Sequence, residues 1–244
     1  MNFSLGEDHL LLRQSARTFL EKEISLSRVQ VPGATVADAG YEANWRKIVG
    51  MGWQGLVIEE EFGGLGLSCI ELAMILGEMG RTLAPSPFLG TLFGTWAIQR
   101  GGSPEQKRAI LPDVATGKTT LALAIAEADG SVDGPCREAS VRRQSGRCVL
   151  TGAKSFVIDA AAADWLVVAA QDEQAGRRAF FLVDARQPGV QVEFLPWRDV
   201  TRQVCDVRLT DAVGEPLSVA DETLWPWLRD RVLFAQAVES AAGT

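Results

Sequence analysis

Hydrophobic residues recur at a helical period along the first part of the chain. One apolar stripe is made of Leu5, Leu12, Ala16 and Phe19. Tyr41–Met51 is predicted as a second helix, which ends near Gly50 and Gly52. The segment between the two helices, residues 25–40, is rich in Val, Gly, Ser and Ala and is expected to be a loop.

Three expected helix starts carry the signal of a capping box. A hydroxyl at the N-cap and a carboxylate or amide three residues later satisfy backbone N–H groups that the first helical turn leaves without partners. The pattern occurs at Ser4–Glu7, Ser68–Glu71 and Ser103–Gln106. Pro104 takes the first helical position of the third, where its missing N–H is tolerated, and Pro112 is expected to mark the end of that helix or to lie close to it.

The pattern changes after Gly117, where short β-rich runs alternate with turns. The last run shows a period of two most clearly, because Cys205, Val207 and Leu209 alternate with charged residues. The predicted strands are Thr119–Ile125, Cys148–Thr151, Ser155–Ile158, Trp165–Ala169, Ala179–Val183, Val190–Phe194 and Val204–Leu209. Such spacing, with no helical pattern between the strands, predicts an antiparallel sandwich or barrel and disfavours a dinucleotide-binding parallel sheet.

The helical period returns from Asp221 onward. Its apolar stripe consists of Leu224, Leu228, Val232 and Ala235. We expect this segment to be the start of a truncated helical bundle. Its stripe would then stay exposed and favour association with another chain.

Composition narrows the classes of function. The net charge is −7 and no Lys/Arg tract occurs, which disfavours nucleic acid and anionic membranes as partners. The sequence shows neither a secretory signal nor an apolar run of about 20 residues, so we expect no membrane span. Four scattered cysteines and one histidine, His9, disfavour a zinc site and most Ser-His or Cys-His catalysis. Reduced thiols in a cytoplasmic protein fit this cysteine usage.

Glycine-rich and proline-containing segments lie at the connections between predicted elements. They are Gly52–Ser68, Glu78–Arg81, Gly102–Lys107, Leu111–Gly117 and Thr151–Lys154. Gly63, Gly64 and Gly66 permit positive φ angles and close chain approach, so a turn explains them better than a phosphate site does. Together these segments resemble the acyl-CoA dehydrogenase family over nearly the whole chain.

This resemblance implies an α+β multidomain fold. An N-terminal all-α helical domain would cover residues 1–118, an antiparallel β-barrel facing a flavin would cover 119–220, and a truncated C-terminal helical domain would begin in 221–244. It also implies FAD as the cofactor, an acyl-CoA as the substrate, and a homo- or hetero-oligomer with another acyl-CoA dehydrogenase chain. In this family the cofactor carries the redox step, and the protein supplies orientation and electrostatics.

The same resemblance assigns candidate site residues. The residues facing the cofactor would be Ile125, Ala126, Glu127, Phe156, Val157 and Ile158, and those facing the substrate Gly130 and Ser131. Ala126 and Ile158 stand where the family has threonine hydroxyls, so two hydrogen bonds to the flavin, each worth about 0.5–1.5 kcal/mol, are lost. Phe156 can still cover the ring. Core packing is the alternative interpretation for Phe156 and Ile158, and a surface turn for Lys154.

The sequence offers no catalytic base, and none is assigned. In the family this carboxylate belongs to the helical domain that would follow residue 244. Glu7, Glu21 and Glu71 are expected on helix surfaces or caps, and the family's counterpart of Glu127 is not the base. The chain alone is therefore expected to be inactive.

Three functions remain open from the sequence. The first is α,β-dehydrogenation of an acyl-CoA thioester by an FAD-dependent enzyme or a piece of one. The second is a non-catalytic partner subunit of a heteromeric acyl-CoA dehydrogenase, and the third a flavin oxidase or monooxygenase on the same fold. Arg81–Leu89 and Leu195–Arg202 resemble bacterial members that act on steroid or other bulky acyl-CoAs.

Overall fold

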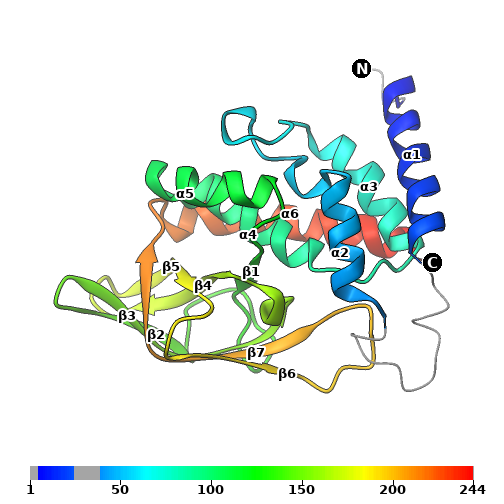
Figure 1. Cartoon of the computed structure of the whole chain (residues 1–244). Coiled ribbons are helices and arrows are strands. Elements are labelled where there is room, and N and C mark those ends of the chain that lie inside the picture. Colours follow the sequence, from blue (N-terminus) through cyan, green and yellow to red (C-terminus); the bar gives the residue numbers. More distant parts are fainter. Residues whose placement is uncertain (1–4, 25–38, 244) are drawn as a thin grey trace.

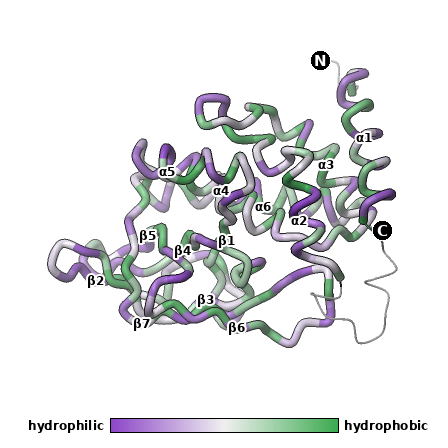
Figure 2. The backbone as a smooth tube through the Cα atoms, in the orientation of Figure 1, coloured by the Kyte–Doolittle hydropathy of each residue, from purple (hydrophilic) through white to green (hydrophobic). Residues whose placement is uncertain are grey.

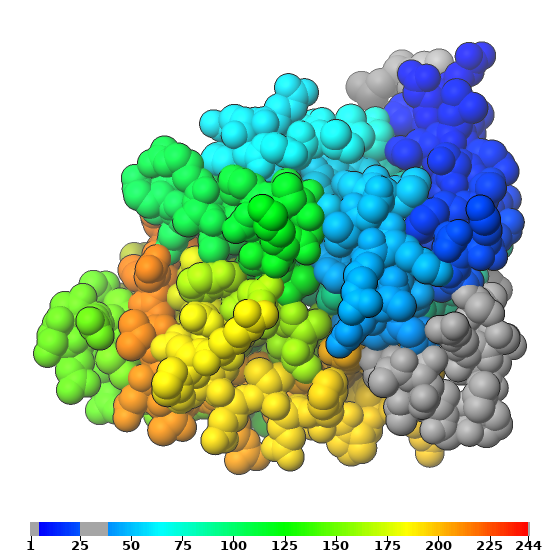
Figure 3. Space-filling view, in the orientation of Figure 1, coloured from blue at the N-terminus to red at the C-terminus, as the bar shows by residue number. Residues whose placement is uncertain are grey.

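The computed structural model describes residues 5–24 and 39–243 and places a helical layer over a β-barrel (Figure 1). The helices are α1 (Glu7–Glu23), α2 (Tyr41–Gly50), α3 (Cys69–Arg81), α4 (Phe88–Gly101), α5 (Pro104–Ala115) and α6 (Asp221–Ala242). The strands are β1 (Leu121–Ala124), β2 (Ala139–Gln144), β3 (Arg147–Ile158), β4 (Trp165–Asp172), β5 (Arg177–Asp184), β6 (Val190–Phe194) and β7 (Val204–Pro216). The two layers are in direct contact on the face drawn in Figure 3. This is the α+β architecture that the sequence predicts.

Two of the three predicted capping boxes are formed. Ser68 Oγ accepts from the Ile70 N–H at 3.0 Å, and Ser103 Oγ accepts from the Gln106 N–H at 3.2 Å. Helix α1 starts at Glu7, with Gly6 as its N-cap, while Ser4 and most of the predicted loop lie outside the described residues. Hydrophilic and hydrophobic stretches alternate along α1 in Figure 2, as expected of a helix that covers the core with one face.

Pro112 lies close to the end of its helix, as expected, but it does not end the helix, because α5 continues to Ala115. A proline inside a helix removes one backbone hydrogen bond and is unfavourable by about 3 kcal/mol. Ile110, Leu111 and Val114 surround Pro112 on this helix, and all three are buried. Their packing holds the last turn in helical form.

Helix α4 was not predicted from the sequence. Every residue from Phe88 to Ile98 is buried, so the segment shows no amphipathic stripe. Two glycines let it approach its neighbours closely. A Cβ on Gly94 would lie 2.4 Å from Leu121 Cβ on β1, and one on Gly90 would lie 2.7 Å from Asp159 Cβ. Helix α4 therefore joins the helical layer to the barrel.

Five strands close the barrel in the order β4-β2-β3-β7-β5, with β5 pairing back onto β4. Strand β1 adds along β4, and β6 adds along β7. The predicted antiparallel barrel is formed, and two pairings depart from this direction, since β1 and β2 each run parallel to β4. Both reach β4 after a long connection, and such a crossover gives parallel pairing.

Strand β3 unites two segments that were predicted as separate strands with a turn at Thr151–Lys154. It runs without interruption from Arg147 to Ile158, and its pairing with β7 shifts register beside Gly152 and again after Lys154. Gly152 has a φ of +129°, and a Cβ there would lie 1.9 Å from the Glu138 carbonyl oxygen. The glycine thus marks a bulge inside a strand rather than a turn. Its partner β2 was missed because half of that strand is polar and exposed.

Helix α6 lies against α3 and α4 of the same chain. Leu224, Leu228 and Ala235 each have no exposed surface, so the expectation of an exposed stripe is wrong. A Cβ on Gly80 of α3 would lie 2.1 Å from the Glu239 carbonyl oxygen on α6, which shows how closely these helices approach. The stripe is covered because α6 crosses the helical layer beside α3 (Figure 1).

Candidate functional site

The two predicted flavin-facing segments lie side by side. The first follows the end of β1, and the second is the end of β3. The Ser155 N–H donates to the Ala126 carbonyl at 2.9 Å, and this bond joins the two segments directly. The fold therefore brings Ile125, Ala126 and Glu127 next to Phe156, Val157 and Ile158.

The three residues at the end of β3 point in different directions. Phe156 has a φ of +55° and 41% of its surface is exposed, an unusual backbone state for a bulky residue. Val157 is 1% exposed and packs inside the barrel, so only its backbone can contact a ligand on the outer face. Ile158 is half-buried and faces the helical layer. A register shift between Lys154 and Val157 produces this arrangement.

Gly130 and Ser131 lie on a tight turn after the first segment. The Gly130 N–H donates to the Glu127 carbonyl at 2.9 Å, and the Glu127 N–H donates to the Ser131 carbonyl at 3.0 Å. Gly130 is exposed with a φ of +79°. Arg137 donates to the Ser131 hydroxyl at 2.9 Å, so this candidate substrate contact has a partner within the chain.

The interpretation of Lys154 as a surface lysine is wrong, because the residue has no exposed surface. Its Nζ lies 2.5 Å from Glu127 Oε1 and 3.3 Å from the Ile125 carbonyl oxygen. Glu127 is 4% exposed and also accepts from the N–H groups of Arg137 and Glu138. This carboxylate is thus a structural partner of a buried cation.

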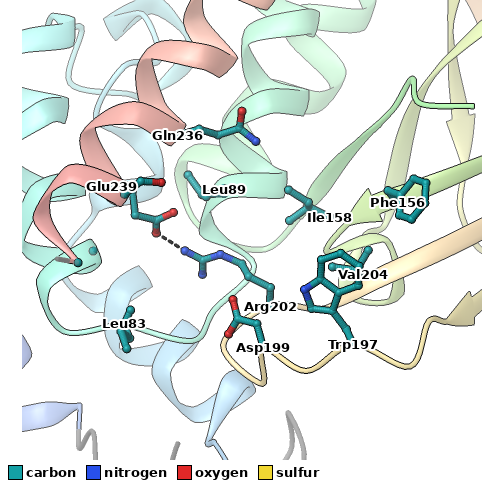
Figure 4. A pocket seen from close by; sticks show the side chains of 13 residues that line it. Leu83, Leu89, Phe156, Ile158, Trp197, Asp199, Arg202, Val204, Gln236 and Glu239 are labelled. Atoms are coloured by element: carbon teal, nitrogen blue, oxygen red, sulfur yellow. Dashed lines mark hydrogen bonds and ion pairs between the residues drawn. The ribbon is translucent and has the colours of Figure 1, made fainter. Parts of the chain in front are cut away.

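A cavity of about 770 Å³ opens where the helical layer, α6 and the barrel meet. Leu83, Leu89, Ile158 and Val204 give it an apolar wall, and Gln236, Glu239 and Ser240 from α6 give it a polar one. Phe156 and Trp197 lie at one side of it, in edge-to-face contact with ring centroids 6.5 Å apart (Figure 4). Of the predicted site residues, only Phe156 and Ile158 line this cavity.

An arginine connects the barrel to α6 across this cavity. Arg202 lies on the connection between β6 and β7 and forms an ion pair with Glu239 of α6 (Figure 4). Burial alone would lower the pKa of Arg202, but the charges of Glu239, Asp159 and Asp199 raise it overall. Asp199 accepts from the Thr201 N–H and hydroxyl at 2.8 and 2.6 Å. Both carboxylates that line the cavity therefore have partners and are poorly placed to act as free bases.

Asp159 follows the flavin-facing segment and anchors it to the helical layer. The Gly90 N–H of α4 donates to its carboxylate at 2.9 Å, and the Tyr41 hydroxyl of α2 donates to the other oxygen. Burial is the main cause that raises the pKa of Asp159 to about 6, although the hydrogen bond from Tyr41 and the charge of Arg202 oppose it. A carboxyl 1% exposed thus holds the end of β3 against two helices.

We expect Asp159→Asn to change the pH dependence of stability. The folded-state pKa is raised, so the folded protein binds more protons than the unfolded chain between about pH 4 and 6. In the wild type, Asp159 contributes up to about 3 kcal/mol to the free energy of unfolding. This contribution is fully present below about pH 4 and is lost as the pH rises through 6. The free energy of unfolding of Asp159→Asn, relative to that of the wild type, should therefore be higher at pH 7 than at pH 4. Urea unfolding at the two pH values measures this difference. An equal difference at both pH values would contradict this prediction.

Glu71 provides a control of opposite sign for that experiment. The Ser68 hydroxyl is the main cause that lowers the pKa of Glu71 to about 2. Its contribution to stability is therefore present above about pH 4.5 and is lost as the pH falls toward 2. Glu71→Gln should lose stability relative to the wild type at neutral pH and approach it in acid.

The sequence did not identify most of the cavity residues. Trp197, Asp199 and Arg202 lie in a segment whose sequence resembles bacterial family members and indicates no specific role, and Glu239 lies in the helix whose apolar stripe is expected to be exposed. The partners of Arg202 and Asp159 are far away in sequence, so no local period reveals them.

Among residues 5–24 and 39–243, no cluster of three or more His, Cys, Asp or Glu side chains could hold a metal ion. No helix within those ranges is long and apolar enough to cross a membrane. The cysteines at positions 69, 136, 148 and 205 are all free.

Comparison with known proteins establishes the family. Residues 6–118 match the acyl-CoA dehydrogenase N-terminal domain, and residues 122–211 match the acyl-CoA dehydrogenase middle domain. The chain belongs to the acyl-CoA dehydrogenase family, as its resemblance predicts.

Two curated relatives extend beyond this chain. An acyl-CoA dehydrogenase of Bacillus subtilis (strain 168) is 27% identical over 195 residues, which are 76% of this chain and 50% of the relative. A 3-(aryl)acrylate reductase of Clostridium sporogenes (strain ATCC 15579) is 28% identical over 232 residues, 86% of this chain and 59% of the relative. The chain thus spans about half to three fifths of the length of these relatives.

Solved structures confirm the fold. The Tcur3481-Tcur3483 steroid ACAD, in a variant form, is 29% identical with a TM-score of 0.82, covering 97% of this chain and 63% of that one. An acyl-CoA dehydrogenase from Bacillus anthracis complexed with FAD is 20% identical with a TM-score of 0.82, covering 98% of this chain and 42% of that one. The helical layer, the barrel and α6 are therefore the arrangement of this family.

Proposed function

We propose that this chain forms the helical and barrel portions of an FAD-dependent acyl-CoA dehydrogenase. One observation carries the proposal: Phe156 adopts a strained positive φ at the mouth of the cavity and leaves its ring exposed there. A bulky residue in this backbone region is unfavourable by about 1–3 kcal/mol and persists where the surrounding structure enforces it. An exposed aromatic ring beside a cavity with an apolar wall suits a planar, partly apolar ligand.

The residues present fit a flavin in part. Phe156 would cover the ring, and backbone groups of Ile125–Glu127 and Val157 would provide hydrogen bonds. When bound, the flavin supplies a two-electron acceptor for the β hydride of an acyl thioester. The side chains of Ala126 and Ile158 cannot donate hydrogen bonds to it, so binding by this chain alone should be weak. Gly130 and Ser131 remain candidate contacts for the acyl-CoA.

In the proposed reaction, this chain binds and orients the flavin and the acyl group. The half-buried Ile158, together with Leu83 and Leu89, would exclude water from an acyl group. The ion pair of Arg202 with Glu239 would hold α6 over the barrel. We propose no catalytic base within the chain. A carboxylate in the portion that the longer relatives have would fill this role.

The second candidate is a non-catalytic partner subunit of a heteromeric acyl-CoA dehydrogenase. Two observations favour it: the missing hydroxyls at Ala126 and Ile158, and the paired state of the carboxylates at the cavity. The similar steroid ACAD, Tcur3481-Tcur3483, also joins two proteins in its name. In this case another chain would supply the base. The division into residues 1–118, 119–220 and 221–244, an oligomeric state and a cytoplasmic location belong to the same proposal.

Flavin titration tests the proposal. We expect the chain alone to bind FAD with a dissociation constant above about 1 µM, because two hydrogen bonds of about 0.5–1.5 kcal/mol each are missing. Phe156→Leu should weaken this binding several-fold. The matched control is Phe194→Leu, which changes an aromatic residue that is 57% exposed and does not line the cavity.

Equal affinities for the Phe156 and Phe194 variants would place the flavin elsewhere. Submicromolar binding by the lone chain would contradict the role given to Ala126 and Ile158. No binding at all would favour the partner-subunit function. Release of hydrogen peroxide during turnover with an added complementary chain would instead indicate an oxidase.

A further inference from the structure

Three reactive side chains meet in a buried cluster that the proposed dehydrogenation does not use. Lys154 Nζ lies 2.5 Å from Glu127 Oε1 and 3.4 Å from Cys136 Sγ. Lys154 is 0%, Glu127 4% and Cys136 8% exposed. They come from β3, from the connection after β1 and from the loop before β2. We call these three residues the Lys154 cluster.

The thiol adds little to the stability of this cluster. The ammonium group already contacts the Glu127 carboxylate and the Ile125 carbonyl oxygen at 3.3 Å. A thiol sulfur is a weak hydrogen-bond acceptor, so satisfying the ammonium does not require Cys136. The contact instead holds a nucleophilic sulfur beside a nitrogen, with a carboxylate placed to take the proton of that nitrogen. These are the components of a condensation between an oxidised thiol and an amine.

We propose that Cys136 and Lys154 form a modification site, at which hydrogen peroxide joins their side chains through a covalent S–N bond. The site adjoins the first of the two flavin-facing segments, because Lys154 Nζ contacts the Ile125 carbonyl oxygen and the Glu127 carboxylate. Formation of the S–N bond would replace the buried ion pair of Lys154 and Glu127 by a neutral covalent link. That link would fix the loop before β2 to strand β3.

The chemistry proceeds in two balanced steps. The Cys136 sulfur attacks one oxygen of hydrogen peroxide, the O–O bond breaks, and a sulfenic acid and one water form. Lys154 passes its ammonium proton to Glu127 and becomes an amine. The amine nitrogen attacks the sulfur, the S–N bond forms, and hydroxide leaves with a second amine proton as water. Sulfur loses two electrons, and the peroxide oxygens are reduced to water.

The surroundings of Cys136 set the expected pace of the reaction. Burial raises the pKa of the Cys136 thiol, and the charge of Lys154 only partly opposes this effect. The reactive thiolate is therefore scarce at neutral pH, and the modification should be slow in dilute peroxide.

Peptide mass spectrometry of the peroxide-treated 244-residue protein tests this proposal. After denaturation and alkylation of free thiols, tryptic digestion should give a peptide pair joined through Cys136 and Lys154. Its mass should be about 2 Da below the sum of the separate peptides, and dithiothreitol should release it. Recovery of Cys136 only as a free thiol or a sulfinic acid, from protein that remained folded during treatment, would overturn the proposal.

Matched variants separate this pairing from general oxidation. Cys136→Ser should abolish the linked pair, while Cys148→Ser, which changes a buried cysteine inside the barrel, should leave it unchanged. Lys154→Arg keeps a cation beside Glu127 but offers no amine, so Cys136 should advance to sulfinic acid instead. A peptide pair linked through Lys154 that persists in Cys136→Ser would disprove the assignment.

Discussion

Replacing Lys154 with methionine should lower the free energy of unfolding by about 3–5 kcal/mol, because the Glu127 carboxylate would remain buried without its cation. The pair is 2.5 Å apart, and Lys154 has no exposed surface. Two backbone N–H groups, from Arg137 and Glu138, would still contact the carboxylate at 3.3 and 2.9 Å. They compensate only part of the desolvation of the charge. Urea unfolding at pH 7, followed by tryptophan fluorescence, measures the loss.

Two further variants test whether this loss of stability comes from the buried, unpaired carboxylate. Lys118 forms a wide ion pair with Asp113 and its side chain is 72% exposed, so Lys118→Met should change stability by no more than about 0.5 kcal/mol. The double variant Lys154→Met/Glu127→Gln removes the uncompensated charge and should recover much of the loss. If Lys154→Met were as stable as Lys118→Met, the buried pair would not exist in solution.

The sequence reveals helices with one buried face and a capped start. Residues Ser68 and Ser103 cap α3 and α5 as expected, because capping depends on atoms within three residues of each other. Helix α4 was missed since burial on all sides removes the period that distinguishes a helix. Strand β2 was missed for the opposite reason: its exposed end is too polar to alternate.

Most features that the sequence does not predict depend on contacts between residues that are far apart in the chain. Lys154 lies two residues after Gly152 in a turn-like sequence, which favours a surface position. Its partner Glu127 is 27 residues away, and only closure of the barrel brings the two together. The same limit applies to the expected exposure of the α6 stripe. That stripe is buried by α3 and α4, whose position relative to α6 is not encoded in any local period.

The residues of the candidate site also differ in whether a local sequence segment or a distant partner reveals them. Phe156 and Ile158 were found by resemblance of a short segment, and the structure places them at the cavity. Arg202 and Asp159 were not found, because their partners Glu239 and Tyr41 are 37 and 118 residues away. A charged residue reveals its role only when its environment is known.

Gly80→Ala should also be strongly destabilising, by about 3–5 kcal/mol. An added Cβ would lie 2.1 Å from the Glu239 carbonyl oxygen, 2.8 Å from its carbonyl carbon and 3.0 Å from its Cα. Overpacking usually has an effect of about 1–3 kcal/mol, but here the obstacle is backbone, which no rotamer change can remove. Helix α6 would have to move away from α3, carrying Glu239 away from Arg202.

Gly77 provides the matched control on the same helix. Nothing lies within 4 Å of a Cβ built on Gly77, so Gly77→Ala should raise stability by up to about 1 kcal/mol through helix propensity alone. In one denaturant experiment, Gly80→Ala should therefore lower the free energy of unfolding, whereas Gly77→Ala should raise it. Because Gly80 and Glu239 both line the cavity, Gly80→Ala should also weaken FAD binding, whereas Gly77→Ala should not. Equal stability of the two variants would mean that α6 does not pack against α3 in solution, and the cavity would then lack its polar wall.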